Sequence, residues 1–204
     1  MDTVIGSDHP YVIPPAGTRV TGGFFAGVIL VAGERHALVV APKAEGELAE
    51  AAIGALEHVA GARSFFDGRA NTTALAEAGS ELARWAIGLR IDECDDFYLP
   101  SRDELEILYR AFKPTAEENY CGSGDNPSSE PLGYAYALDA PKQTAIDAFK
   151  DGGVEAFADD WYWSSTQYAG YESCAWFQGF DDGYQDDTHE GYELRARAVR
   201  RFKI

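Results

Sequence analysis

Carboxylates are concentrated between residues 181 and 190, and their side chains are of the type that binds a metal ion. The candidate ligands are Asp181, Asp182, Asp186, Asp187 and Glu190. Calcium takes several hard oxygen ligands, so the cluster is a candidate calcium site. The spacing differs from that of an EF-hand loop, and two alternatives stay open: the carboxylates are solvated, or they pair with nearby basic residues. Those basic residues are Arg195, Arg197, Arg200, Arg201 and Lys203.

Aromatic residues that could stack on a ligand are concentrated in the same part of the chain. The segment WYWSSTQYAGYESCAWFQGFDDGYQDD, residues 161–187, has nine aromatic residues in 27 positions. An exposed ring beside polar groups can stack on a sugar or anchor a protein contact. The ligand-binding candidates are Tyr168, Tyr171, Glu172, Tyr184 and His189. The alternative is that these rings fold back over a sheet.

Residues for catalysis do not form a recognisable set, and we expect no enzyme. The four histidines lie apart and form no H-E-x-x-H pattern, and Ser164 is not in a G-x-S-x-G turn. The three cysteines lack C-x-x-C spacing. Cys174 alternates with Trp176 and Phe180, which indicates a packed, unreactive thiol.

Composition restricts the partners. The chain has 204 residues, of which 46% are hydrophobic, and its formal net charge is -17. Such a charge repels phosphate backbones and anionic membrane surfaces, so we expect no nucleic-acid partner. The longest apolar run, GGFFAGVILVAG, is too short and too rich in glycine to span a bilayer, so we expect no membrane insertion. The N-terminus lacks the features of a secretory signal, which predicts folding in a cytoplasm.

Strands are expected near both ends of the chain. Two β-branched runs in residues 24–42 flank a glycine-containing break and predict a hairpin. Alternation over residues 174–180, followed by Asp-Gly, predicts a strand and a tight turn. In LRARAV, residues 194–199, we expect Arg195 and Arg197 to point outward. The three tryptophans of the aromatic segment lie on strands and are expected mainly in the core: Trp161, Trp163 and Trp176.

Helices are expected in the middle of the chain. Residues 99–114 carry the capping box of Ser101 and Glu104, followed by apolar residues at helical spacing. Two helical segments are expected within residues 71–90, the second capped by Ser80. Weaker patterns predict helices over residues 48–59 and from Pro141 to 149. Residues 115–136, rich in Gly, Ser, Asn, Asp and Pro, predict a long surface loop.

Four motifs in this order resemble the Lcl C-terminal-domain family, which is common in bacteriophage and prophage genomes. They are DGRANTTAL (67–75), DDFYLPSRDELEILYRAFKP (95–114), YWSSTQ (162–167) and AWFQGFDDGYQDDTHEGYELRARAVRRF (175–202). The resemblance implies an α+β domain over residues 21–204 with a loop-rich C-type-lectin-like fold, two main helices and small antiparallel sheets. Residues 1–20 fall outside it and are expected to form an arm or tether. Formylglycine-generating relatives depend on a reactive cysteine pair, which this chain lacks.

The resemblance also implies a class of role. It implies a bacteriophage virion protein of the tail fibre or tail tip, made in the host cytoplasm, that binds a host cell-surface receptor through residues 115–136 and 168–191. The receptor would be a glycan or a protein. The alternative is a structural virion protein that decorates or joins neighbouring virion subunits without a host ligand. A homo-oligomer stays open, although the chain has no heptad repeat.

Overall fold

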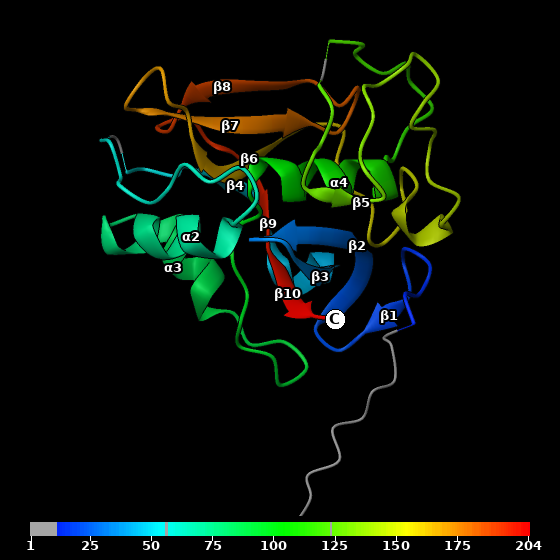
Figure 1. The fold of residues 1–204 in the computed structure, drawn as a ribbon, viewed down its shortest axis with the longest axis horizontal. Helices are drawn as coiled ribbons and strands as arrows, with labels where there is room; N and C mark the ends of the chain where they lie inside the picture. The colour runs from blue at the N-terminus through cyan, green and yellow to red at the C-terminus, as the bar shows by residue number, and fades with distance from the viewer. Residues whose placement is uncertain (1–11, 56, 123) are drawn as a thin grey trace, which may run out of the picture.

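Two largely antiparallel sheets lie on either side of helix α4 (Arg102–Phe112) and make the chain a mixed α+β structure (Figure 1). The computed structural model describes residues 12–55, 57–122 and 124–204. The first sheet has the order β1-β2-β3-β10, and β5 pairs with β2. Its strands are β1 (Arg19–Val20), β2 (Gly23–Val31), β3 (Glu34–Val40), β5 (Ser129–Glu130) and β10 (Val199–Lys203). The hairpin predicted for residues 24–42 is therefore confirmed as β2 and β3.

The second sheet carries the aromatic segment and has the order β4-β9-β6-β7-β8. Its strands are β4 (Glu47–Ala51), β6 (Trp161–Gln167), β7 (Cys174–Gly179), β8 (Gln185–His189) and β9 (Leu194–Arg197). Among the described strands, β6 and β9 share one parallel pair, Tyr162 with Arg195. The strand predicted at residues 174–180 is confirmed, and the turn at Asp182 and Gly183 leads from β7 to β8.

The described residues form four α-helices rather than the two main helices expected. They are α1 (Lys43–Gly46), α2 (Gly68–Glu77), α3 (Glu81–Gly88) and α4, and η1 (Asp147–Phe149) is a 3₁₀ turn. Helices α2 and α3 pack against each other beside the second sheet (Figure 1). The side chain of Ser80 caps α3 as predicted, whereas α2 begins earlier than predicted, with Asp67 as its N-cap.

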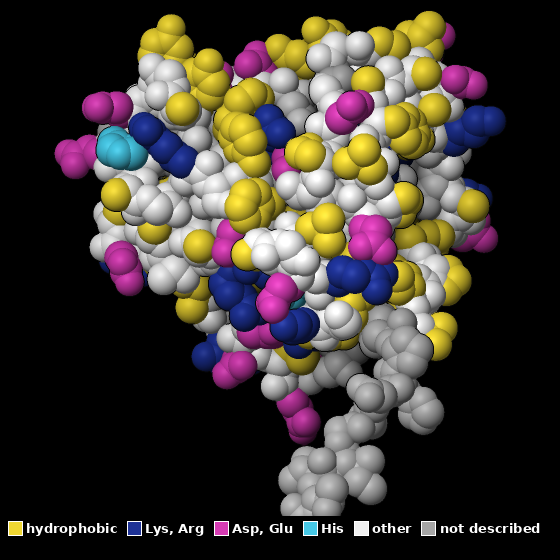
Figure 2. All heavy atoms as spheres, in the orientation of Figure 1, with side chains coloured by type: hydrophobic (Ala, Val, Ile, Leu, Met, Phe, Trp, Pro, Cys, Tyr) yellow, Lys and Arg dark blue, Asp and Glu magenta, His cyan; other side chains and the backbone are white. Residues whose placement is uncertain are grey.

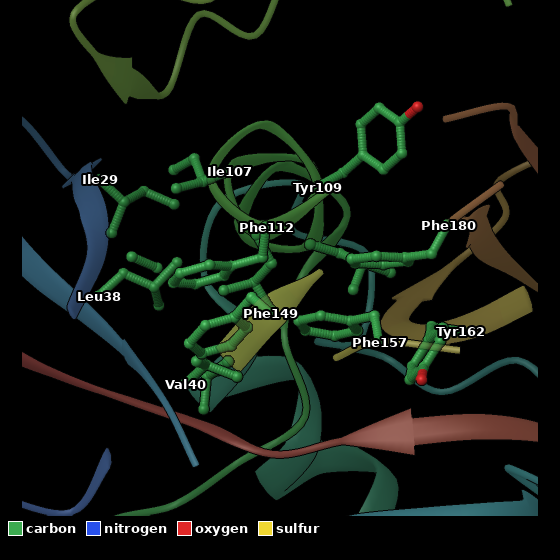
Figure 3. Close-up of a cluster of buried hydrophobic side chains, with 14 of the residues drawn as sticks. Ile29, Leu38, Val40, Ile107, Tyr109, Phe112, Phe149, Phe157, Tyr162 and Phe180 are labelled. Atoms are coloured by element: carbon green, nitrogen blue, oxygen red, sulfur yellow. The ribbon is translucent and has the colours of Figure 1, made fainter. Parts of the chain in front are cut away.

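Helix α4 is buried on almost every side because it lies between the sheets. Its predicted apolar face is confirmed as part of the main core, which Figure 3 shows. The rings of Phe112 and Phe149 stack at 3.9 Å, and those of Phe157 and Phe180 stack at 4.0 Å. Buried aromatic rings contribute large apolar areas, so this short helix has a strong packing interaction with both sheets.

The capping box of α4 extends into a buried network around the Glu104 carboxylate. Oε2 accepts hydrogen bonds from the backbone N–H groups of Ser101 at 2.8 Å and Gly68 at 3.1 Å. Oε1 accepts from the Tyr98 hydroxyl at 2.6 Å and from Arg201 Nη1 at 3.2 Å. A buried carboxylate is tolerated when hydrogen bonds and a cation satisfy it. This one carboxylate therefore joins α2, α4, the segment before α4 and β10.

Two predicted helices are wrong. Residues 47–51 form β4, which pairs with β9 through Leu48 and Ala196, so sheet pairing outweighs the weak helical pattern of residues 48–59. From Pro141 onward, the chain has helical geometry only in the η1 turn. The backbone N–H of Thr144 donates instead to the Lys113 carbonyl at 2.9 Å, which ties this segment to the end of α4.

Burial differs from the prediction at three positions. Arg197 points inward and is fully buried, because Glu155 pairs with its Nη2 at 2.6 Å and the Ala41 carbonyl accepts from its Nε. Paired in this way, a guanidinium can be buried. Trp163 is buried as expected, but Trp161 is 44% exposed and Trp176 is half-buried.

The predicted N-terminal arm, residues 1–20, is described only in part, because residues 1–11 lie outside the described residues. Within the remainder, β1 pairs with β2, and the N–H of Gly17 donates to the carbonyl of Phe25 at 2.8 Å. No helix in the described residues is both long enough and apolar enough to cross a membrane.

Replacing Gly68 with alanine will destabilise the fold, because a Cβ there would lie 2.3 Å from Glu104 Oε2 and 2.5 Å from Ser101 N. We expect the free energy of unfolding in urea to fall by about 1–3 kcal/mol, as in other overpacked sites. The matched control is Gly88→Ala, whose Cβ would meet nothing within 4 Å. It should leave stability unchanged or raise it by up to about 1 kcal/mol. Equal losses in both variants would contradict the role of Gly68.

Asp67 adds a pH-dependent contribution to the same network. Burial alone would raise the pKa of this carboxyl, but hydrogen bonds from Arg201 and the Ala70 N–H, with the charge of Arg201, hold it below its usual value. A lowered folded-state pKa stabilises the protein above the unfolded-state pKa of about 3.9. That stability is lost as the pH falls through the folded-state pKa.

Asp67→Asn will therefore cost about 1–3 kcal/mol of unfolding free energy at neutral pH, because it removes a charged partner of Arg201. The difference from the wild type should shrink below about pH 4, where the Asp67 carboxyl of the unfolded chain becomes protonated, and vanish below the lower pKa of the folded state. Urea denaturation over a series of pH values measures it. A difference that stays constant through this range would show that the charge of Asp67 is not involved.

Candidate functional site

Five side chains from distant parts of the sequence meet beside the second sheet. We call this set the Arg102 surface, and its residues are Phe65, Arg102, Tyr168, Tyr171 and Trp176. Phe65 precedes α2, Arg102 is the first residue of α4, Tyr168 follows β6, and Trp176 lies in β7. Figure 2 shows hydrophobic side chains gathered over β7 and β8 on the face that it displays.

The rings of the Arg102 surface contact one another and the guanidinium. Arg102 lies 3.9 Å from the ring centroid of Phe65 and 5.4 Å from that of Trp176. Phe65 and Trp176 make an edge contact at 6.1 Å, and Tyr168 makes another with Trp176 at 5.5 Å. Tyr171 continues the row, 6.0 Å from Tyr168. Edge and cation–π contacts of this kind hold aromatic side chains in defined orientations.

Backbone hydrogen bonds fix Phe65 beside the start of α4. Its carbonyl accepts from the N–H of Asp103 at 2.9 Å. The carbonyl of the preceding residue, Ser64, accepts from Asn71 Nδ2 at 2.7 Å and from Thr166 Oγ1 at 2.8 Å. These bonds come from α4, α2 and β6, so the loop is attached to three elements at once.

Arg102 is held by its neighbour Asp103. Its Nε and Nη2 both donate to Asp103 Oδ1, at 3.1 and 2.9 Å, and Asp103 Oδ2 accepts from Ser128 Oγ at 2.6 Å. The Asp103 side chain is almost completely buried, while Arg102 keeps part of its side chain exposed. The guanidinium is therefore fixed in place with part of its surface open to a ligand.

The exposure of these rings is what makes the surface a candidate for binding. Tyr171 is 67% exposed and Phe65 is 40% exposed. Nε1 of Trp176 is buried and has no hydrogen-bond partner among the described residues. Leaving such a donor unsatisfied costs about 1–3 kcal/mol. A ligand oxygen reaching it after a small ring movement would offset that cost.

The structure separates the five residues predicted to bind a ligand. Tyr168 and Tyr171 belong to the Arg102 surface, and Glu172 is exposed in the turn that follows. His189 is exposed on β8, opposite Cys174 in the strand register, with its ring 6.2 Å from that of Tyr192. Tyr184 is not part of this surface.

Tyr184 lies on the opposite face of the sheet. Its ring contacts Phe177, whose side chain points away from that of Trp176 because the two residues are adjacent in β7. The ring of Tyr120 makes an edge contact with Tyr184 at 4.7 Å. The Tyr184 hydroxyl donates to Asp186, and this bond raises the pKa of Tyr184 to about 12. Tyr184 is therefore half-buried and packs against the core. This matches the alternative that the candidate rings fold back over a sheet.

The five predicted calcium ligands do not converge on one point. Asp186 and Asp187 are consecutive in β8 and point to opposite faces. Glu190 is fully buried and accepts from Gln167 Nε2 at 2.8 Å, and Asp182 Oδ1 accepts from the N–H of Tyr184. Oδ1 of Asp181 is buried and has no hydrogen-bond partner within the described part of the chain. Over residues 12–55, 57–122 and 124–204, no three or more His, Cys, Asp or Glu side chains form a group that could hold a metal ion.

The basic residues of the C-terminal segment pair with acidic residues elsewhere in the chain. The pairs are Arg195 with Asp160 and Glu47, Arg197 with Glu155 and Glu47, Arg200 with Asp96, Arg201 with Asp67 and Glu104, and Lys203 with Glu34. Among the described residues, these ion pairs are therefore made with acidic residues outside the 181–190 cluster. The acidic partners lie far away in the sequence and are brought close by the fold.

Cys174 is half-buried rather than fully packed. Burial, followed by the charge of Asp187, raises the pKa of the Cys174 thiol. A raised pKa keeps the thiol protonated at neutral pH, and a protonated thiol is a poor nucleophile. This agrees with the unreactive thiol predicted from its alternation with Trp176.

Phe65 and Arg102 were missed by sequence reasoning, although each gave a weak signal. Phe65 and Phe66 are two adjacent aromatic residues just before a turn-forming Asp-Gly, in a segment with no helical or strand pattern. Arg102 is a cation in the first turn of a helix, where the dipole disfavours positive charge. Such a residue needs a partner, and the partner is Asp103.

Comparisons with known proteins supply no family for the chain. No family model matches it, and no curated protein matches it.

Tyr171→Ala and Tyr184→Ala will differ in their effect on stability. The Tyr171 ring is largely exposed, so its removal should change the free energy of unfolding by less than about 0.5 kcal/mol. Tyr184 packs against Phe177 and bonds to Asp186, so its removal should cost about 1–3 kcal/mol. Urea denaturation of the two variants measures the difference. Similar values would mean that the assignment of the two rings to different environments is wrong.

Proposed function

We propose that this chain is a binding protein of a bacteriophage virion, of the tail fibre or tail tip, that contacts a host-surface glycan or protein through the Arg102 surface. The domain over residues 21–204 would have a C-type-lectin-like fold. The observation that carries the proposal is a row of aromatic rings, of which Phe65 and Tyr171 are exposed, around the fixed and partly exposed side chain of Arg102. The four motifs that resemble the Lcl C-terminal-domain family support a role in a bacteriophage virion.

The chemistry of the surface suits a ligand with both apolar and hydroxyl groups. The faces of Phe65 and Tyr171 can stack on the C–H face of a sugar ring or on an apolar side chain. Arg102 can donate hydrogen bonds to hydroxyl or carbonyl oxygens beside them. The net charge of -17 disfavours a polyanionic ligand, so a neutral or cationic receptor fits better.

Preorganisation supports a binding role as well. Phe65 is attached by backbone bonds to α4, and Arg102 is fixed by the buried Asp103. A surface whose side chains are already ordered loses less conformational entropy when a ligand binds. Tyr171, at the outer end of the row, is the member that is free to adapt to a ligand.

The test is the binding of fluorescently labelled protein to bacterial envelopes from the candidate host, in calcium and in EDTA. We expect saturable binding, weakened roughly tenfold or more by Tyr171→Ala, as for loss of an exposed aromatic ring that contacts the ligand directly. Trp161→Ala is the control, because Trp161 is another exposed aromatic ring, 44% exposed against 67% for Tyr171, and it lies on the other face of the sheet. It should leave binding unchanged.

Three outcomes would count against the proposal. Absence of saturable binding would favour the structural virion role, in which the domain contacts neighbouring subunits. An equal loss in the Tyr171 and Trp161 variants would show that the Arg102 surface is not the specific contact. Loss of binding in EDTA, with no effect of Tyr171→Ala, would place the contact at the 181–190 carboxylates.

A further inference from the structure

A cavity lies away from the Arg102 surface, between α4, β2 and the loop that follows β5. Its volume is about 220 Å³. Its walls are mostly apolar and include Ala26, Val28, Ile107, Ala111 and Leu132. The side chain of Arg110 also lines it and brings a guanidinium group to its wall.

Arg110 is fixed but incompletely hydrogen-bonded. Its Nε donates to Glu106, and its Nη2 donates to the carbonyl of Tyr134. The rings of Tyr134 and Tyr136 lie 4.3 and 4.9 Å from the guanidinium carbon. Nη1 is buried and has no hydrogen-bond partner among the described residues. Leaving a buried donor next to an apolar cavity without an acceptor destabilises the protein, because the lost hydrogen bond to water is not replaced.

The carboxylates near the cavity already have partners. Glu106 pairs with Arg110 and also accepts from Tyr136 at 2.8 Å and from Asn126 at 2.7 Å. Glu130, which lines the cavity, receives two hydrogen bonds from Arg35 at 2.9 and 2.7 Å. Neither carboxylate therefore needs a cation from a ligand. The unmet requirement is an acceptor for Arg110 Nη1.

We propose that this cavity binds a small apolar molecule that carries one carbonyl or carboxylate oxygen. The apolar part would fill the space between Ala26, Ile107 and Ala111, and the oxygen would accept from Arg110 Nη1. The Tyr134 ring stacks on the guanidinium and is half exposed, so it would shift to admit the oxygen.

The volume decides between a small molecule and a peptide. A cavity of roughly 150 Å³ holds one benzene molecule, so about 220 Å³ holds a phenyl ring with a short chain. An extended peptide could place only one side chain in it, and its backbone would lie outside. The single unpaired donor matches a single oxygen, not the repeated acceptors of a peptide backbone.

The test uses the full chain and three ligands of similar shape. They are 3-phenylpropanamide and 3-phenylpropanoate, which carry the oxygen, and propylbenzene, which lacks it. We expect the first two to shift the NMR methyl signals of Ala26, Ile107 and Ala111 and the ring signals of Tyr134. They should bind roughly tenfold or more tightly than propylbenzene, as expected for a hydrogen bond to a charged group.

Two variants locate the ligand. Ala111→Leu should fill the cavity and abolish the shifts. Arg110→Met should lower the affinity for both oxygen-containing ligands to that of propylbenzene, while Arg84→Met, at an exposed position of α3, should change nothing. Equal affinities of all three ligands for the wild type, or no methyl shifts up to the solubility limit, would overturn the proposal. So would unchanged binding to Ala111→Leu.

Discussion

The buried carboxylate of Glu104 is the interaction on which the arrangement of the other elements depends. It accepts hydrogen bonds from Ser101, Gly68, Tyr98 and Arg201, which belong to the segment before α4, to α2 and to β10. Removing any one donor would leave a charge in a low-dielectric environment with fewer partners, and this penalty holds the parts together. Burial and the adjacent Glu104 also raise the pKa of Tyr98, so its hydroxyl remains a donor at neutral pH.

The same helix provides both candidate binding sites. Arg102 in the first turn of α4 belongs to the exposed aromatic surface, and Arg110, two turns later, lines the apolar cavity. Asn126 connects the two, because its Nδ2 donates to the carbonyl of Asp103 and to the side chain of Glu106. These acidic residues hold Arg102 and Arg110 respectively. The loop before β5 therefore supports the cation of each site.

Some elements could be predicted from residues that lie close together in the sequence. The capping box of Ser101 and Glu104 and the break in the 24–42 hairpin were predicted correctly, because their residues interact within a few positions. Arg197 was placed on the wrong face because its partners, Glu155 and Ala41, lie 42 and 156 positions away. The Arg102 surface could be predicted only in part for the same reason. Tyr168 and Tyr171 were recognised, but their neighbours come from two distant segments.

The most direct test of the binding role is hydrogen–deuterium exchange of the wild-type chain with and without host envelopes. Exchange is slowed where a ligand covers or orders the backbone. We predict that slower exchange is confined to residues 64–66 and 168–176, the segments that carry the exposed rings of the Arg102 surface. Slower exchange elsewhere, with these two segments unchanged, would contradict a binding role for this surface.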